Sequence, residues 1–113
     1  MKDNEYEGSD RRTFFRIFYQ PTKKPKLIVG EHEFEIADIS EGGIRLINDQ
    51  NIKLEGPVSG KTTFLYGESI NIEGEVVWKQ NNQVGILLKD YILPATMEKE
   101  KQFVILESLK NDV

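Results

Sequence analysis

Through most of the chain, apolar and polar residues alternate with a period of two, as in a strand with one buried face. Phe34 and Ile36, for example, alternate with Glu33 and Glu35. Short polar turns separate these stretches, and the segment 52–60 is expected to be a loop or a short edge strand. The pattern predicts antiparallel strands at 14–19, 26–29, 33–38, 44–47, 64–66, 70–78 and 84–88.

The end of the sequence changes to a helical pattern. Pro94 is followed by good helix formers at 95–102, so a helix is expected from about residue 94. Several apolar residues then share one broad face, at roughly 100° per residue, and are expected to seal the strands. These residues are Phe103, Ile105, Leu106 and Leu109. Met97 and Val104 point nearly opposite and suit either a dimer contact or a loosely packed helix end.

Short antiparallel strands followed by one helix indicate a mostly β fold, a small β-barrel with a C-terminal α-helix. The chain has 113 residues, which suits one such domain, expected over 11–110. Residues 1–10 are polar and acidic and are expected to form a flexible N-terminal arm.

The amino-acid composition limits the cellular compartments and the kinds of functional site that we expect. The chain has no cysteine, which excludes a disulfide framework, a zinc ribbon and a thiol nucleophile. No apolar run approaches the roughly 18 residues of a membrane helix, and the N-terminus lacks the apolar segment of a signal peptide. With one histidine and no cluster of metal ligands, little is available to build an active site. We expect a cytoplasmic protein without catalysis, cofactor or membrane insertion.

Charge is distributed unevenly along the chain. The net charge of -4 argues against binding of nucleic acid polymers, which normally requires a basic face. However, residues 11–26 contain six of the 15 basic residues and none of the 19 acidic ones. A small basic patch on an acidic body suits a compact anion, although an ordinary solvated charge cluster has the same composition.

Two polar clusters, one at each end of the first predicted hairpin, carry the candidate chemistry. Guanidinium groups grip phosphate oxygens bidentately and stack on bases. A carboxylate accepts hydrogen bonds, as the N–H donors on one edge of guanine require. From spacing alone, Asp38 could equally cap the glycine turn that follows it. The candidate ligand-binding residues are Arg11, Arg12, Arg16, Asp38, Ser40, Gly42 and Gly43.

Two motifs in these clusters resemble the signatures of the PilZ domain. One is an RxxxR element that ends at Arg16, and the other is a DxSxxG element that begins at Asp38. The segments 74–78 and 84–86 are also similar to the late hairpin of that family, so the resemblance covers about 10–88. It implies a six-stranded β-barrel with a C-terminal helix. It also implies a bacterial, non-enzymatic receptor for the second messenger cyclic di-GMP.

The resemblance assigns roles to most of the candidate residues. Arg12 and Arg16 are expected to clamp the phosphates and the guanines of the ligand. Asp38 and Ser40 are expected to read guanine. Gly43 is expected to shape the floor of the site, because glycine permits positive φ and a close approach of the ligand to the backbone.

The residue before the RxxxR element bears on stoichiometry. In the family, an arginine at this position, here Arg11, goes with binding of an intercalated ligand dimer, so two nucleotides per protein are expected. The N-terminal arm is expected to become ordered over the ligand and to present a new surface to a downstream protein. The protein itself is expected to be a monomer or a weak homodimer.

Two side chains are expected on buried faces of the strands. Asp38 continues the buried register of Phe34 and Ile36, and a carboxylate there needs a partner. Trp78 falls in register with the aliphatic residues Ile72 and Val76, so it is expected in the core rather than on a base.

Two other functions compete with the receptor hypothesis. One is a protein-interaction module that keeps the PilZ fold and binds no nucleotide, although such chains usually lack one of the two motifs. The other is a small OB-like barrel that binds single-stranded nucleic acid. The acidic balance and the absence of a basic aromatic groove disfavour this second alternative.

Overall fold

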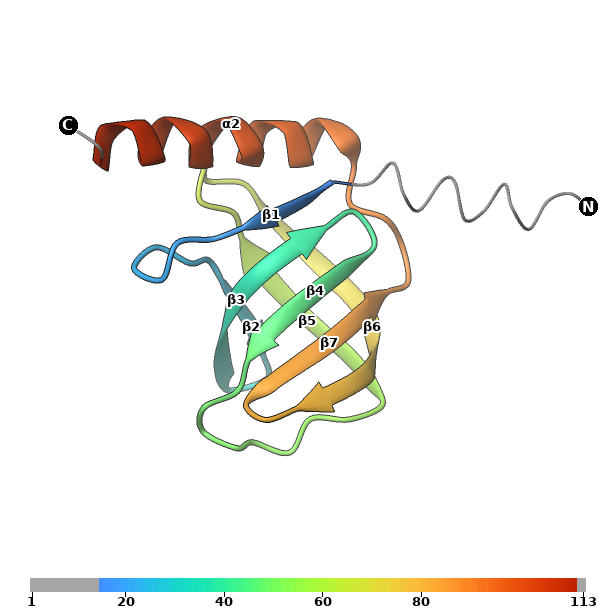
Figure 1. Cartoon of the computed structure of the whole chain (residues 1–113). Coiled ribbons are helices and arrows are strands. Elements are labelled where there is room, and N and C mark those ends of the chain that lie inside the picture. Colours follow the sequence, from blue (N-terminus) through green and yellow to red (C-terminus); the bar gives the residue numbers. More distant parts are fainter. Residues whose placement is uncertain (1–14, 112–113) are drawn as a thin grey trace, which may run out of the picture.

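The computed structural model describes residues 15–111, which form seven strands and one helix (Figure 1). The elements are β1 (Arg16–Phe18), β2 (Lys26–Val29), β3 (His32–Ser40), β4 (Gly43–Ile47), β5 (Pro57–Thr63), β6 (Ser69–Gln80), β7 (Gln83–Leu88) and α2 (Pro94–Asn111). Gly30 and Asn81 have positive φ, as the tight connections β2–β3 and β6–β7 require.

Six of the strands form a closed antiparallel barrel with the order β3-β2-β5-β6-β7-β4, and pairing of β3 with β4 closes the ring. The short strand β1 is additional. β2 pairs with the first part of β3, and β1 pairs with the last part of β3 along the same edge. Helix α2 lies across one end of the barrel (Figure 1). The predicted six-stranded barrel with a C-terminal helix is confirmed.

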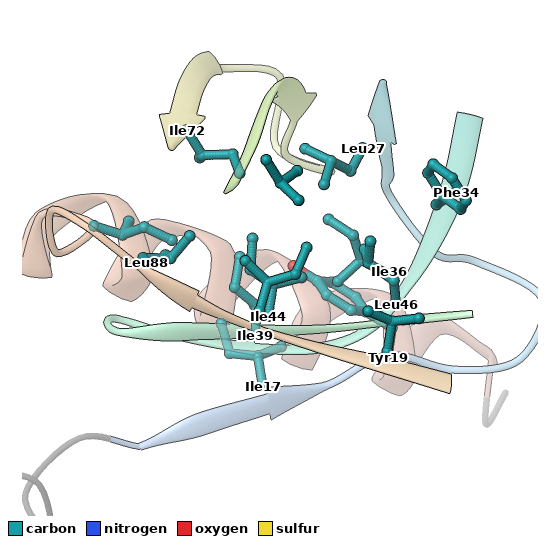
Figure 2. Close-up of a cluster of buried hydrophobic side chains, with 14 of the residues drawn as sticks. Ile17, Tyr19, Leu27, Phe34, Ile36, Ile39, Ile44, Leu46, Ile72 and Leu88 are labelled. Carbon is teal, nitrogen blue, oxygen red and sulfur yellow. The ribbon is translucent and has the colours of Figure 1, made fainter. Parts of the chain in front are cut away.

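Alternate residues of the strands point into the barrel and form one core, in which side chains from different strands meet (Figure 2). Leu27, Ile36, Ile39 and Leu46 are fully buried there. The period-two pattern of the sequence therefore describes most of the core correctly.

Helix α2 presents a different face to the barrel from the one predicted. Met97 is fully buried and Val104 packs against the core, whereas Ile105, Leu106 and Leu109 are at least half exposed. The prediction that the apolar face with Leu106 and Leu109 seals the barrel was therefore wrong. Within residues 15–111, no helix is both long and apolar enough to cross a membrane.

The cause of this difference is a buried carboxylate on the helix. Glu100 is fully buried and accepts hydrogen bonds from Tyr19 Oη (2.7 Å) and from the backbone N–H groups of Leu65 (3.0 Å) and Tyr66 (3.1 Å). Burial and the hydrogen bond to Glu100 raise the pKa of Tyr19. From the sequence, a helix face that contains an acidic residue is expected to be exposed to solvent. The apolar pattern therefore predicted that the opposite face packs on the barrel.

One strand is also displaced from its predicted position. The segment 57–63 forms β5, although a loop or short edge was expected there, and the predicted strand at 64–66 is a turn. Phe64 is apolar because it anchors this turn in the core, not because it continues the strand.

Gly74 marks a close crossing of strands, since a Cβ there would lie 2.5 Å from the carbonyl oxygen of Leu87.

Candidate functional site

Two β-bulges decide which side chains face outward. In β3, Ile36 pairs with Leu46 and Asp38 pairs with Arg45, so Ala37 is an extra residue that has no pairing partner in β4. An extra residue reverses the alternation of side chains beyond it. Ile39 therefore points into the core, and Asp38 lies on the outer face. The prediction that Asp38 continues the inward register was wrong, although its carboxylate is almost completely covered by neighbouring side chains.

The second bulge lies in β6. Val76 pairs with Ile86 and Trp78 pairs with Gly85, so Val77 is the extra residue. Trp78 is consequently turned out of the barrel and is 41% exposed, which contradicts its predicted place in the core. A Cβ on Gly85 would lie 2.1 Å from the indole nitrogen of Trp78, so the ring lies directly over this glycine.

Asp38 lies between two arginines on the outer face. Arg16 of β1 donates from Nη1 to Asp38 Oδ1 at 2.5 Å, and Arg45 of β4 forms an ion pair through Nη2 with Asp38 Oδ2. The side chain of Asp38 is 2% exposed, against 39% for Arg16 and 35% for Arg45. The buried carboxylate thus holds two guanidinium groups that are themselves partly exposed.

Ser40 and Gly43 complete the polar floor. Ser40 Oγ accepts from Arg16 Nη2 at 3.3 Å. Gly43 does not have positive φ, so that part of the expectation was wrong. Its lack of a side chain is still used, because a Cβ there would lie 3.3 Å from the carbonyl oxygen of Ile86 and 3.5 Å from Arg16 Nη2. The glycine thus allows the close approach of the β7 backbone, whereas the distance to Arg16 corresponds to an ordinary van der Waals contact.

Apolar side chains border this polar floor. Phe18 from β1, Leu87 from β7 and Tyr91 beyond it are all more than half exposed, as is Val77 next to Trp78. Aromatic rings beside arginine donors are suited to a ligand that has both flat rings and anionic groups.

Together these side chains line a pocket of about 580 Å³, within the ~300–1,000 Å³ typical of small-molecule sites. Five of the predicted site residues are brought together in it. They are Arg16, Asp38, Ser40, Gly42 and Gly43. Arg11 and Arg12 lie outside the residues that the structure describes, as does the predicted arm at 1–10.

Among the pocket residues that the sequence analysis missed, Arg45 and Trp78 bear most on the chemistry of the site. Arg45 has a readable signal, because it follows the glycine turn after Asp38 and an antiparallel return brings it beside that residue. Trp78 has no such signal, because a bulge cannot be seen in the alternation of apolar residues. The pocket therefore contains, beside Arg16, a second arginine and an aromatic wall that the motifs do not include.

A second hollow lies near the other end of β3 and is lined mainly by polar and acidic residues, among them Glu31, Glu33 and Asp49. Among residues 15–111, no group of three or more His, Cys, Asp or Glu side chains is arranged to hold a metal ion. This hollow thus has no feature that indicates a ligand.

Comparison with known proteins agrees with the geometry. The family model described as PilZ domain matches residues 10–105. The chain is similar in structure to the Legionella uncharacterized protein Lpg0364, with a TM-score of 0.51 and 18% identity over 87% of this chain and 96% of that one. It is also similar to the PilZ domain of CeSA from a cellulose synthesizing bacterium, with a TM-score of 0.46 and 20% identity over 83% and 98%. No curated protein matches the chain. Because the family model spans most of the sequence, this protein belongs to the PilZ domain family.

Proposed function

We propose that this protein is a receptor for cyclic di-GMP, without catalytic activity, that signals to a protein partner. The PilZ domain is a family of cyclic di-GMP receptors. The observation that carries the proposal for this chain is the convergence of Arg16, Asp38, Ser40 and the glycine turn on one pocket with aromatic borders. A charged floor suits the phosphates of the ligand, and the aromatic border suits its purines.

Both oxygens of Asp38 are engaged by arginines. For Asp38 to accept from the N–H donors of guanine, one of these arginines has to turn away. Arg16 then binds a phosphate or a guanine through its other donors, and Ser40 supports it. Gly42 and Gly43 keep this part of the floor low enough for the ligand to approach.

Arg11 and Arg12 would contribute from the segment that precedes β1. They add two guanidinium groups to those of the pocket, which favours binding of the four phosphates of an intercalated pair of cyclic dinucleotides. Phe15 packs against the core, and Nζ of Lys101 in α2 lies over its ring, 4.8 Å from the ring centre. Phe15 thus lies beside α2, and ordering of the arm over the ligand would alter the surface offered to a partner.

The test is a calorimetric titration of the purified protein with cyclic di-GMP, beside GMP and cyclic di-AMP. We expect saturable, selective binding of two ligands per protein. Arg12→Ala and Arg16→Ala should each weaken binding by about thirty- to thousand-fold, the loss of one charge-assisted bidentate contact. Lys53→Ala is the matched control, because this lysine is 85% exposed in a loop outside the pocket.

Absence of binding under varied salt and temperature would reject the receptor function. It would favour a PilZ-fold module that binds proteins and no nucleotide. Strong, salt-dependent binding of single-stranded oligonucleotides would instead favour the OB-like alternative.

A further inference from the structure

Arg45 and Asp38 are direct cross-strand partners on the outer face of the barrel. Arg45 Nη2 contacts Asp38 Oδ2, and Arg45 Nη1 donates to Gln83 Oε1 at 3.3 Å. The Arg45 Nε is buried without a hydrogen-bond acceptor, and Asp38 Oδ2 also lacks a partner of good hydrogen-bond geometry. The contact is thus close but incompletely satisfied, so its two groups have unused hydrogen-bonding capacity.

We propose that Arg45 is a specificity-determining residue that donates to O6 of guanine. The inference rests on the proposed function and extends it to a residue outside the two motifs. As guanine enters, Arg45 turns from Asp38 Oδ2 to the O6 acceptor. The N1–H and 2-amino donors of the same base edge then take its place on Asp38.

The chemistry of the base edge explains the selectivity. Guanine presents one acceptor followed by two donors, and an arginine beside a carboxylate presents donors followed by acceptors. Adenine presents a donor where guanine has O6, so Arg45 would face another donor. A site built to make such hydrogen bonds rejects the wrong partner strongly, because buried polar groups are left unpaired.

Arg45 could instead act only by holding Asp38 in position, and a suitable ligand separates the two roles. Cyclic di-IMP keeps O6 and N1–H but lacks the 2-amino group. The affinity ratio between cyclic di-GMP and cyclic di-IMP therefore reports the contact of the 2-amino group with Asp38, and it is insensitive to a contact at O6.

The experiment measures the affinity of both ligands for the unmodified protein, Arg45→Met and Lys61→Met. Lys61→Met removes one positive charge from an exposed position on β5, away from the pocket. We expect Arg45→Met to weaken binding of both ligands by about 5- to 150-fold, the range for one arginine contact with a guanine edge. The affinity ratio should stay unchanged, and Lys61→Met should bind as the unmodified protein does.

Two results would overturn the proposal while leaving the receptor function intact. One is that Arg45→Met binds both ligands as tightly as the unmodified protein does. The other is that the affinity ratio between cyclic di-GMP and cyclic di-IMP falls to about one in Arg45→Met, which would make Arg45 a positioning residue for Asp38. Failure of the unmodified protein to bind cyclic di-GMP would instead reject the receptor function. Thermal unfolding of Arg45→Met, followed by circular dichroism, shows whether the variant is folded at the temperature of the titration.

Discussion

The indole ring of Trp78 lies over Gly85, its cross-strand partner, at a place where a Cβ would be 2.1 Å from Nε1. The bulge at Val77 turns the tryptophan outward, and the missing side chain of Gly85 lets it lie flat on the sheet. The pair therefore forms part of the pocket wall instead of part of the core.

Gly85→Ala should displace this ring. Because Trp78 is partly exposed, it can move, so we expect a loss in the free energy of unfolding of about 1–2 kcal/mol, the cost of modest overpacking. Tryptophan fluorescence should change, and ligand affinity should fall. A cycle with Trp78→Ala tests the cause, because Gly85→Ala should cost almost nothing once the ring is absent. Equal costs in both backgrounds would contradict the proposed clash.

Asp38→Asn should destabilise the protein even without ligand. The substitution puts an amide N–H₂ against one of the two guanidinium groups and removes the charge that both arginines share. We expect a loss of about 1–2 kcal/mol in urea unfolding, at the lower end for buried pairs because the arginines are partly exposed. Glu73→Gln removes a well-exposed pair with Lys89 and should cost at most about 0.5 kcal/mol. Similar values for the two variants would show that the Asp38 cluster does not stabilise the fold.

Glu100→Ala should be among the most destabilising changes in α2. It leaves the hydroxyl of Tyr19 and the N–H groups of Leu65 and Tyr66 without their acceptor. We expect a loss of about 3–5 kcal/mol in urea unfolding. Glu98→Ala on the exposed side of the same helix should stay within about 0.5 kcal/mol. A small effect of Glu100→Ala would mean that water replaces the carboxylate.

Tyr19 should make stability fall at alkaline pH. Its pKa is raised in the folded state by burial and by Glu100, so the unfolded chain loses this proton first. The stabilisation is complete below the unfolded pKa of about 10 and is lost above it, by up to about 1.4 kcal/mol per pH unit. Unfolding free energies measured between pH 8 and pH 11 should show a shallower decline in Tyr19→Phe. Parallel declines would exclude this tyrosine as the titrating group.

The orientation of α2 gives a direct comparison of two apolar residues. Met97→Ala should cost about 2–4 kcal/mol, because Met97 is fully buried. Leu109→Ala should change stability by about 0.5 kcal/mol or less, because Leu109 is 57% exposed. Denaturant unfolding of the two variants tests the arrangement, and the reverse order would restore the face predicted from the sequence.

The sequence was sufficient for the architecture and for the polar half of the site. Alternation between apolar and polar residues is a local property, so it revealed most strands and most of the core. The spacing of Arg16, Asp38 and Ser40 was also sufficient, because pairing of β1 with β3 sets Arg16 opposite Ser40. The motif residues at described positions therefore meet as predicted.

The parts that were missed depend on contacts that alternation does not encode. Trp78 changed sides because of one unpaired residue, and a bulge leaves no mark in the apolar pattern. The face of α2 that carries Glu100 packs on the barrel because three donors from distant segments hydrogen-bond to its carboxylate. The shifted strand register in the first case and tertiary hydrogen bonding in the second outweighed the local preference.

The bulge at Ala37 makes the pairing of β3 as decisive as its composition. If Ala37 were paired as a regular strand residue, Ile39 would face solvent and Asp38 would face the lipophilic interior. Every letter of the DxSxxG element would remain, yet the carboxylate would no longer meet its arginines. A relative that carries the full motif on a strand of the same length without the bulge would therefore have the signature of a receptor but not its site.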